Sequence, residues 1–260
     1  LGISVIPMPF YINEKLYLEG ITLSQEEFYE KLKKDEPIST SQPSPADLCD
    51  LWDKLLRDYE EIVHIPMSSG LSASCSTAMG LAIDYNGRVQ VVDNQRISVT
   101  QRQSVMDAKM LAEAGKSAAE ITAALEEVRP KVRASFVVDT LMYLYRGGRC
   151  NAVAAMAGSV LKLHPKIVVE NGAMDAAKKY RGKLHSVVMS YVRDMEADLK
   201  SARPERVFIT HSGCDRKIVE DVQAYLQSLG IFQEILETRA GGVVSSHCGP
   251  GTLGVLFIAK

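Results

Sequence analysis

Apolar residues along the chain follow two different spacings, and each spacing predicts a different element. Short runs rich in β-branched and aromatic residues predict strands at 3–12, 62–67, 88–93, 134–138, 206–210, 232–237 and 254–259. Between these runs, apolar residues at helical spacing predict helices at 24–34, 44–56, 71–82, 98–114, 117–128, 140–145, 183–201 and 215–229. Because strands alternate with helices, the pattern indicates an α/β layered fold.

Polar residues mark where several of these helices begin. Ser24 with Glu27, and Ser117 with Glu120, match the capping box, in which each side chain bonds the backbone N–H of the other residue. Pro45 follows a serine and is suited to the first helical position, where its missing N–H costs nothing. These residues predict helix starts near 24, 44 and 117.

A hairpin separates the two halves of the pattern. The apolar runs 167–170 and 174–178 flank Asn171-Gly172, a pair that favours the tight turn of an antiparallel hairpin. We therefore expect two lobes: residues 1–150 as an N-terminal α/β lobe with a parallel sheet, and residues 151–260 as a C-terminal α/β lobe with a mixed sheet. A ligand is expected in the cleft between them.

Composition narrows the classes of protein that the chain can belong to. The formal net charge is −2, so no strong positive field attracts nucleic acid. The five cysteines are far apart and form no C-x-x-C pair, which favours reduced thiols in a cytoplasmic protein over a disulfide framework or a zinc site. No apolar run is long enough to cross a bilayer.

The first twelve residues do not have the features of a targeting sequence. Residues 1–12 are apolar but lack a basic flank and a small-residue cleavage site, so they do not match a signal peptide. The chain begins without Met, inside a strand pattern. We expect that further residues precede it.

Three hydroxyl-rich segments are predicted where strands and helices meet, at 39–44, 68–74 and 245–252. In open α/β sheets, ligands bind beyond the carboxyl ends of strands, where helix N-termini offer unpaired N–H groups. Hydroxyls added there suit an anionic head group. Taken one at a time, however, these serines and threonines are more typical of helix caps and turns than of a ligand site.

Enzymatic interpretations compete for the same residues. The segment 70–74 nearly matches the G-x-S-x-G turn of serine hydrolases, but Ser74 replaces its closing glycine. His247 could act as a base for Ser72, although no acidic residue is obviously placed to orient it. The match of 249–254 to G-x-G-x-x-G lies too near the chain end for a dinucleotide site, and no P-loop or H-x-x-x-H metal motif is present.

Taken together, four motifs resemble those of the DegV family, which includes the fatty-acid-binding subunits of bacterial fatty acid kinases. They fall in the family's order and spacing over nearly the whole chain: Thr40-Ser41-Gln42-Pro43, Ser68-Ser69-Gly70-Leu71-Ser72, Leu141-Met142-Tyr143-Leu144 with Arg146-Gly147-Gly148-Arg149, and His247 with Gly249-x-Gly251-x-x-Gly254. One departure is that members usually begin with a strand and an Asp-Ser-Thr loop, which is absent here.

The resemblance implies a set of ligand-binding residues. Thr40 and Ser72 match positions at the ligand carboxylate, and His247 matches a histidine that joins the same hydrogen-bond cluster. Arg149 matches a family arginine whose role is either electrostatic or organising for the backbone. The remaining candidates are their motif neighbours Ser41, Ser69 and Gly70.

The implied function is that of a carrier without cofactor or metal. The ligand is one long-chain fatty acid, with its carboxylate on the hydroxyls and its tail in an apolar tunnel drawn from 3–10, 154–163 and 167–169. A separate ATP-dependent fatty acid kinase subunit is the implied partner, so this chain would not be the catalyst. The alternatives are a hydrolase that uses Ser72 and His247, and a subunit related to dihydroxyacetone kinases with a compact polar pocket.

Overall fold

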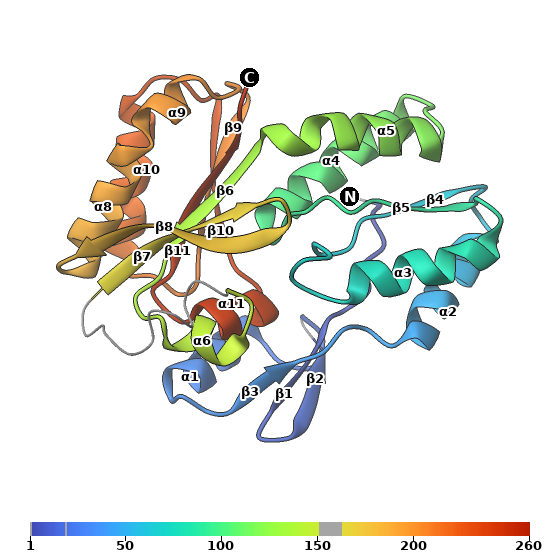
Figure 1. The fold of residues 1–260 in the computed structure, drawn as a ribbon, viewed down its shortest axis with the longest axis horizontal. Coiled ribbons are helices and arrows are strands. Elements are labelled where there is room, and N and C mark those ends of the chain that lie inside the picture. The colour runs from blue at the N-terminus through green and yellow to red at the C-terminus, as the bar shows by residue number, and fades with distance from the viewer. Residues whose placement is uncertain (1, 19, 151–162) are drawn as a thin grey trace.

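A six-stranded mixed sheet forms the larger part of the fold (Figure 1). The computed structural model describes residues 2–18, 20–150 and 163–260. The strand order is β10-β9-β11-β6-β7-β8, in which β9 and β10 are parallel and the other neighbours antiparallel. The strands are β6 (Val132–Val137), β7 (Leu163–Glu170), β8 (Ala173–Arg181), β9 (Arg206–His211), β10 (Glu234–Arg239) and β11 (Leu253–Ile258).

Helices cover both faces of this sheet. They include α4 (Val99–Glu113), α6 (Met142–Gly147), α8 (Leu184–Asp194), α9 (Glu196–Lys200), α10 (Arg216–Ser228) and α11 (Gly242–Cys248). A further helix, α5 (Ala118–Val128), packs against α4. Side chains of β11 alternate between the two faces: Val255 packs in the cluster with α8 and α10, and Leu256 in the cluster with Val99 of α4. Because both sides are covered, every residue of β11 is buried.

Two smaller sheets belong to the N-terminal part of the chain. The parallel pair is β4 (Ile62–His64) with β5 (Val89–Val91), flanked by α2 (Pro45–Leu55) and α3 (Ser74–Ala82). The antiparallel sheet has the order β2-β1-β3, from β1 (Pro9–Ile12), β2 (Lys15–Leu18) and β3 (Ile38–Thr40), with α1 (Gln25–Lys33) beside it. The predicted α/β class, with a small parallel sheet and a larger mixed one, is confirmed.

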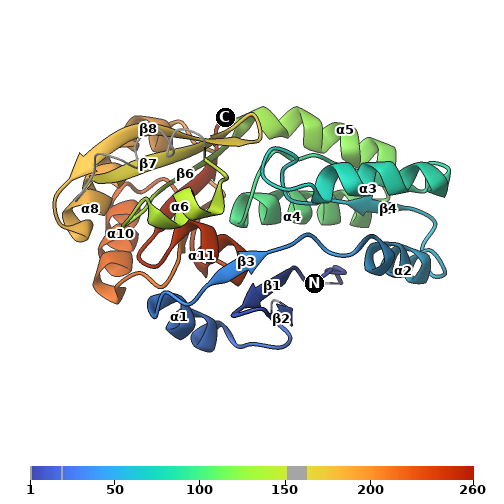
Figure 2. The ribbon, with the colours of Figure 1, turned by 60° about the horizontal axis from the view of Figure 1, so that its bottom comes forward.

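The antiparallel sheet lies against α11, as Figure 2 shows. Phe10 of β1, Phe28 of α1 and Val243 of α11 share one buried cluster. This packing brings the end of β3 next to a helix that is 200 residues away in the sequence. The candidate functional site lies at this contact.

Several local predictions are confirmed. Ser24 and Ser117 cap α1 and α5 through complete capping boxes, and Ser44 caps α2 ahead of a proline. Asn171 and Gly172 join β7 to β8 with φ values of 50° and 82°, the two left-handed positions that a tight hairpin turn requires.

Other boundaries differ from the prediction. Residues 242–248 form the short helix α11, which the sequence pattern did not predict, and His247 lies in its last turn. The predicted helix at 183–201 is two helices that meet at Met195. The first predicted strand is shorter, since only Pro9–Ile12 pairs, and its hairpin partner β2 was not predicted.

The predicted division of the chain into two lobes, residues 1–150 and 151–260, stays a prediction. The six-stranded sheet crosses the boundary between them, because β6 precedes it and pairs with β7 and β11, which follow it. The sequence carries no sign of this, because strand pairing over long separations leaves no local pattern.

Candidate functional site

Thr40 and His247 meet where β3 packs against α11. The Oγ1 atom of Thr40 lies 2.9 Å from Nε2 of His247. Both residues line a cavity of about 150 Å³, together with Ser41, Ser72 and Arg149. The structure thus brings five of the seven predicted site residues to the wall of one cavity.

The rest of this cavity wall is mostly apolar. Methionine, leucine, isoleucine and valine side chains come from the start of the chain, the loop after β4, the loop before α4, strand β8 and helix α11. They are Met8, Met67, Leu71, Ile97, Met174, Val243 and Val244. A polar end next to an apolar wall suits an amphipathic ligand.

The imidazole of His247 is neutral at pH 7. Burial, with a smaller contribution from the charge of Arg149, lowers the pKa of His247 to about 4. Its Nδ1 atom is buried and has no hydrogen-bond partner among the described residues. A proton on Nε2 can be donated to Thr40, whereas a proton on Nδ1 would be a buried unpaired donor. The geometry therefore favours the Nε2–H tautomer, which leaves the hydroxyl hydrogen of Thr40 free to point into the cavity.

Arg149 holds the backbone beside the histidine. Its Nη1 donates to the carbonyl oxygen of Gly147 at 2.6 Å, and its side chain lines the cavity. A Cβ atom at Gly147 would lie 2.2 Å from Nδ1 of His247. The two alternatives left open by the sequence are thus compatible, because Arg149 both organises the backbone and places a positive charge near the imidazole.

Ser72 lies at the turn that leads into α3. Its Oγ is 2.8 Å from Oγ of Ser74 and accepts from the Ser74 backbone N–H at 3.2 Å. The part of the chain that the structure describes shows no hydrogen bond between Ser72 and His247, whose Nε2 faces Thr40. The serine–histidine pair that a hydrolase would need is not formed.

Ser69 and Gly70 stabilise the loop and do not line the cavity. The hydroxyl of Ser69 donates to Oδ2 of Asp93 at 2.5 Å, and its N–H donates to Oδ1 at 3.2 Å. A Cβ at Gly70 would lie 2.4 Å from the carbonyl oxygen of Gly172, so the loop packs directly on the turn of the β7–β8 hairpin. Ser68 adds a hydrogen bond of 2.7 Å to the same oxygen.

Only part of the segments predicted to form the acyl tunnel lines a cavity. Met8 of segment 3–10 lines this cavity, and Val5, Ile6, Pro7 and Pro9 line a neighbouring one. Ile167 and Val169 are buried in the core of the six-stranded sheet. Residues 151–162 of the segment 154–163 lie outside the described residues. Sequence reasoning missed the valines of α11 and the role of Gly147, although the glycine pair at 147–148 was a signal for a close backbone approach.

Within residues 2–18, 20–150 and 163–260, no group of three or more His, Cys, Asp or Glu side chains could hold a metal ion. None of the helices in these ranges has the length and apolar character needed to cross a membrane.

Comparison with known proteins gives a consistent result. A family model described as "Uncharacterised protein, DegV family" matches residues 1–260. A DegV domain-containing protein of Deinococcus radiodurans is 32% identical over 258 residues, covering 98% of this chain and 90% of the relative. Protein DegV of Bacillus subtilis is 30% identical over 264 residues, covering 99% of this chain and 92% of the relative.

Solved structures show the same fold. A fatty-acid-binding DegV family protein from Thermus thermophilus superposes with a TM-score of 0.90 at 29% identity, covering 100% of this chain and 92% of that chain. DegV of Bacillus subtilis, described as a fatty acid binding protein, gives a TM-score of 0.84 at 28% identity, covering 98% of this chain and 91% of that chain. The chain therefore belongs to the DegV family.

Proposed function

We propose that this chain binds one long-chain fatty acid, with the carboxylate at Thr40, Ser72 and His247 and the acyl tail along the apolar wall of the cavity. The observation that carries the proposal is the Thr40–His247 contact of 2.9 Å at the polar end of that cavity. The fatty-acid-binding relatives from Thermus thermophilus and Bacillus subtilis support it.

The polar end has the groups that a carboxylate needs. Hydroxyl donors replace the water that the carboxylate loses, and Arg149 supplies a positive charge within the same cavity. Because His247 is neutral, it fixes the direction of the Thr40 hydroxyl and does not compete as an ion. Ser41 is a further hydroxyl on the wall, while Ser69 and Gly70 act by holding the loop that carries Ser72.

The tail would supply most of the affinity. At about 0.8 kcal/mol per buried CH₂, fourteen or so methylenes contribute on the order of 10 kcal/mol before ordering costs. The cavity of about 150 Å³ is smaller than typical ligand pockets of roughly 300 Å³ or more. It accommodates the head group and the first carbons. A neighbouring cavity of about 640 Å³ shares Ser41 and Gln42 with it and offers room for the remainder of the tail.

We also propose that the bound acid is presented to a separate ATP-dependent kinase subunit, with this chain as a cytoplasmic, non-catalytic carrier. The carboxylate site is made of neutral hydroxyls, an imidazole and one arginine, a set that binds an acid without activating it. Among the described residues, the cavity of Thr40 and His247 lacks the serine–histidine hydrogen bond that the hydrolase alternative needs. Its wall is mostly apolar, which does not favour the dihydroxyacetone-kinase-like alternative.

Co-purified lipid tests the binding proposal. Native mass spectrometry of the purified chain should show one bound acyl chain, and the Thr40→Val variant should retain less of it. Protein that carries no lipid and takes up no labelled fatty acid would overturn the proposal. Turnover of acyl esters that disappears in Ser72→Ala would establish the hydrolase instead.

The kinase step needs its own test. The loaded chain is incubated with ATP and the kinase subunit of a fatty acid kinase, and acyl phosphate is measured. Formation of acyl phosphate that depends on both proteins supports presentation to a kinase. Binding of the acid without any acyl phosphate, with kinase subunits from several bacteria, would leave a carrier with a different recipient.

A further inference from the structure

A second cavity, of about 290 Å³, lies at the carboxyl ends of the parallel strands β9 and β10. The last residues of the two strands, His211 and Arg239, are neighbours in register and both line it. It shares no lining residue with the cavity of Thr40 and His247. Loops beyond the carboxyl ends of parallel strands are where α/β folds bind their ligands.

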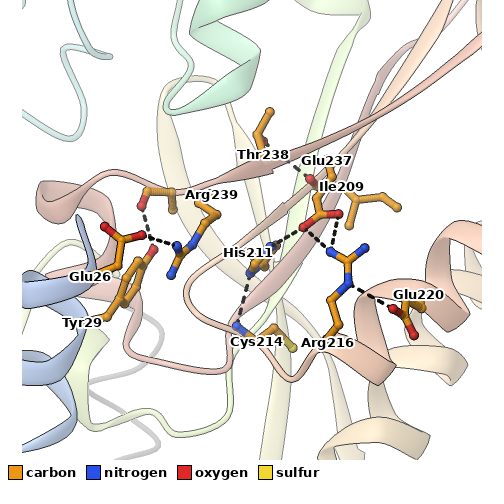
Figure 3. Close-up of polar contacts among 11 residues, drawn as sticks. Glu26, Tyr29, Ile209, His211, Cys214, Arg216, Glu220, Glu237, Thr238 and Arg239 are labelled. Carbon is orange, nitrogen blue, oxygen red and sulfur yellow. Dashed lines mark hydrogen bonds and ion pairs between the residues drawn. The ribbon is translucent and has the colours of Figure 1, made fainter. Parts of the chain in front are cut away.

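Three cationic side chains from three elements line this second cavity. Lys33 comes from α1, Arg216 from α10 and Arg239 from β10, and Figure 3 shows the two arginines on either side of His211. Glu237 is the acidic residue on the wall. Side chains that converge from separate elements make a concave basic site, unlike the charge pairs along a single exposed helix.

Arg239 is oriented for recognition of an anion. Its guanidinium lies 4.8 Å from the centroid of the Tyr29 ring, which fixes the plane of its N–H groups. Among the described residues its ion pair is with Glu26, at 3.0 Å, and the Glu26 side chain is 75% exposed. An exposed partner of this kind is held weakly, so a ligand anion can take its place.

The carboxylate of Glu237 already has hydrogen-bond partners among the other residues that line this cavity. It accepts two contacts from Nη1 of Arg216, at 2.9 and 2.8 Å, and one of 3.3 Å from Nε2 of His211. His211 is neutral, because burial lowers its pKa, and its Nδ1 accepts from the backbone N–H of Cys214. Lys33 pairs with Glu30 of its own helix at 3.3 Å, and that carboxylate is exposed, as is Glu26 beside Arg239. Lys33 and Arg239 therefore face the cavity without a buried counter-charge.

The same contacts argue for binding and against catalysis by the nearby thiol. Burial raises the pKa of Cys214 to about 11, so the thiol stays protonated. The Nδ1 of His211 is occupied by a backbone N–H and cannot take the thiol proton. Asp215 already caps α10, so the site depends on its side chains and not on the helix end.

We infer that this second cavity binds the phosphate group of a small phosphate monoester, held by Arg239 and Lys33, with Arg216 on the facing wall. A planar guanidinium and an ammonium from separate elements match the several acceptor oxygens and double charge of a phosphate. The volume is near the lower limit of about 300 Å³ for small-molecule sites, which leaves room beside the phosphate for a small organic group.

Titration calorimetry with inorganic phosphate and with glycerol 3-phosphate, in buffer of constant ionic strength, tests this inference. Wild-type protein should bind both at one site, and the ester more tightly because it fills more of the cavity. The variants are Lys33→Gln, Arg239→Gln and their combination, and Lys200→Gln serves as a matched control because it removes a paired surface lysine far from the lining set. Tyr29 is kept, since its hydroxyl bonds Ala240 and Ser245.

The double variant should lose at least about tenfold in affinity for both ligands, and Lys200→Gln should lose none. Circular dichroism and uptake of labelled fatty acid check that each variant folds; Lys33→Gln, on an exposed side chain, supplies the test if Arg239→Gln does not fold. Tighter binding of free phosphate than of the ester would show that phosphate itself is the ligand. No saturable binding at millimolar concentrations, or equal binding by wild type and Lys33→Gln, would overturn the inference.

Discussion

Gly147 lies so close to His247 that any side chain at position 147 would have to displace the imidazole. A Cβ built on Gly147 would lie 2.2 Å from Nδ1 of His247, far inside van der Waals contact. The backbone of the Arg-Gly-Gly-Arg motif therefore sets how deeply the imidazole reaches toward Thr40. This contact gives the glycine a physical role that depends on its lack of a side chain.

We predict that Gly147→Ala weakens fatty acid binding more than it weakens the fold. The methyl group must push the imidazole away from Gly147, which breaks or lengthens the 2.9 Å contact between His247 and Thr40. Loss of this hydrogen bond between neutral groups, which orients the donor to the ligand, costs roughly 0.5–1.5 kcal/mol, about a two- to twelvefold drop in affinity. Fluorescent fatty acid titration measures it.

Gly80→Ala is the matched control for that substitution. Gly80 is within α3, and a Cβ there would meet nothing within 4 Å. It should leave affinity unchanged and stabilise the helix by about 0.5–1 kcal/mol. Wild-type affinity in Gly147→Ala would show that the imidazole position does not matter for the ligand.

Thr40 gives a second prediction, because valine matches its shape and lacks its hydroxyl. Thr40→Val removes both the acceptor for His247 and the proposed donor to the ligand, and should reduce affinity by roughly 0.5–2 kcal/mol. Thr40→Ser keeps the hydroxyl and should restore most of the binding. If Thr40→Ser binds as poorly as Thr40→Val, the methyl group and not the hydroxyl is what the site uses.

The sequence predicted the site better than it predicted the elements that carry the site. Thr40, Ser72 and His247 were predicted from their motifs, and they line one cavity. The helix that carries His247 was missed, because the small and polar residues of 242–248 have no helical pattern of apolar positions. A helix this short is stabilised mainly by its packing against β1, β3 and α6, and no local sequence pattern shows such packing.

The roles of individual residues were harder to predict than their positions. Ser69 and Ser72 are three residues apart in one hydroxyl-rich loop, yet Ser69 bonds Asp93 and Ser72 faces the cavity. The partners of such side chains come from distant segments, so the sequence of a hydroxyl-rich loop does not show which hydroxyl stabilises the loop and which faces a ligand. The second cavity could not be predicted at all, since Lys33, Arg216 and Arg239 meet only through the fold.

The contact between the Ser68 loop and the β7–β8 hairpin leads to a stability prediction. Ser68 is fully buried, and its hydroxyl donates to the carbonyl of Gly172 at 2.7 Å. Ser68→Ala leaves that carbonyl without its donor and should lower the free energy of unfolding by about 1–3 kcal/mol. Urea denaturation measures it, with the exposed Ser76→Ala as control. Equal losses in the two variants would mean that the hairpin contact contributes nothing.

The last prediction concerns pH. Burial lowers the pKa of both His64 and His247 from 6.5 to about 4 in the folded chain. Between these values the unfolded chain binds protons that the folded chain does not, so unfolding is favoured by acid. The stabilisation is fully present above pH 6.5, and it is lost as the pH falls from about 6.5 towards 4.

Urea denaturation at a series of pH values should show this decline, on the order of a kcal/mol or more for each histidine. His247→Gln should remove one part of the slope and His64→Gln the other, because the two residues lie in different clusters. His185→Gln is the control, since that imidazole is on the surface beside Asp221. If the slope between pH 6.5 and 4 is the same in all three variants, carboxylates and not the two buried imidazoles are responsible for the acid sensitivity.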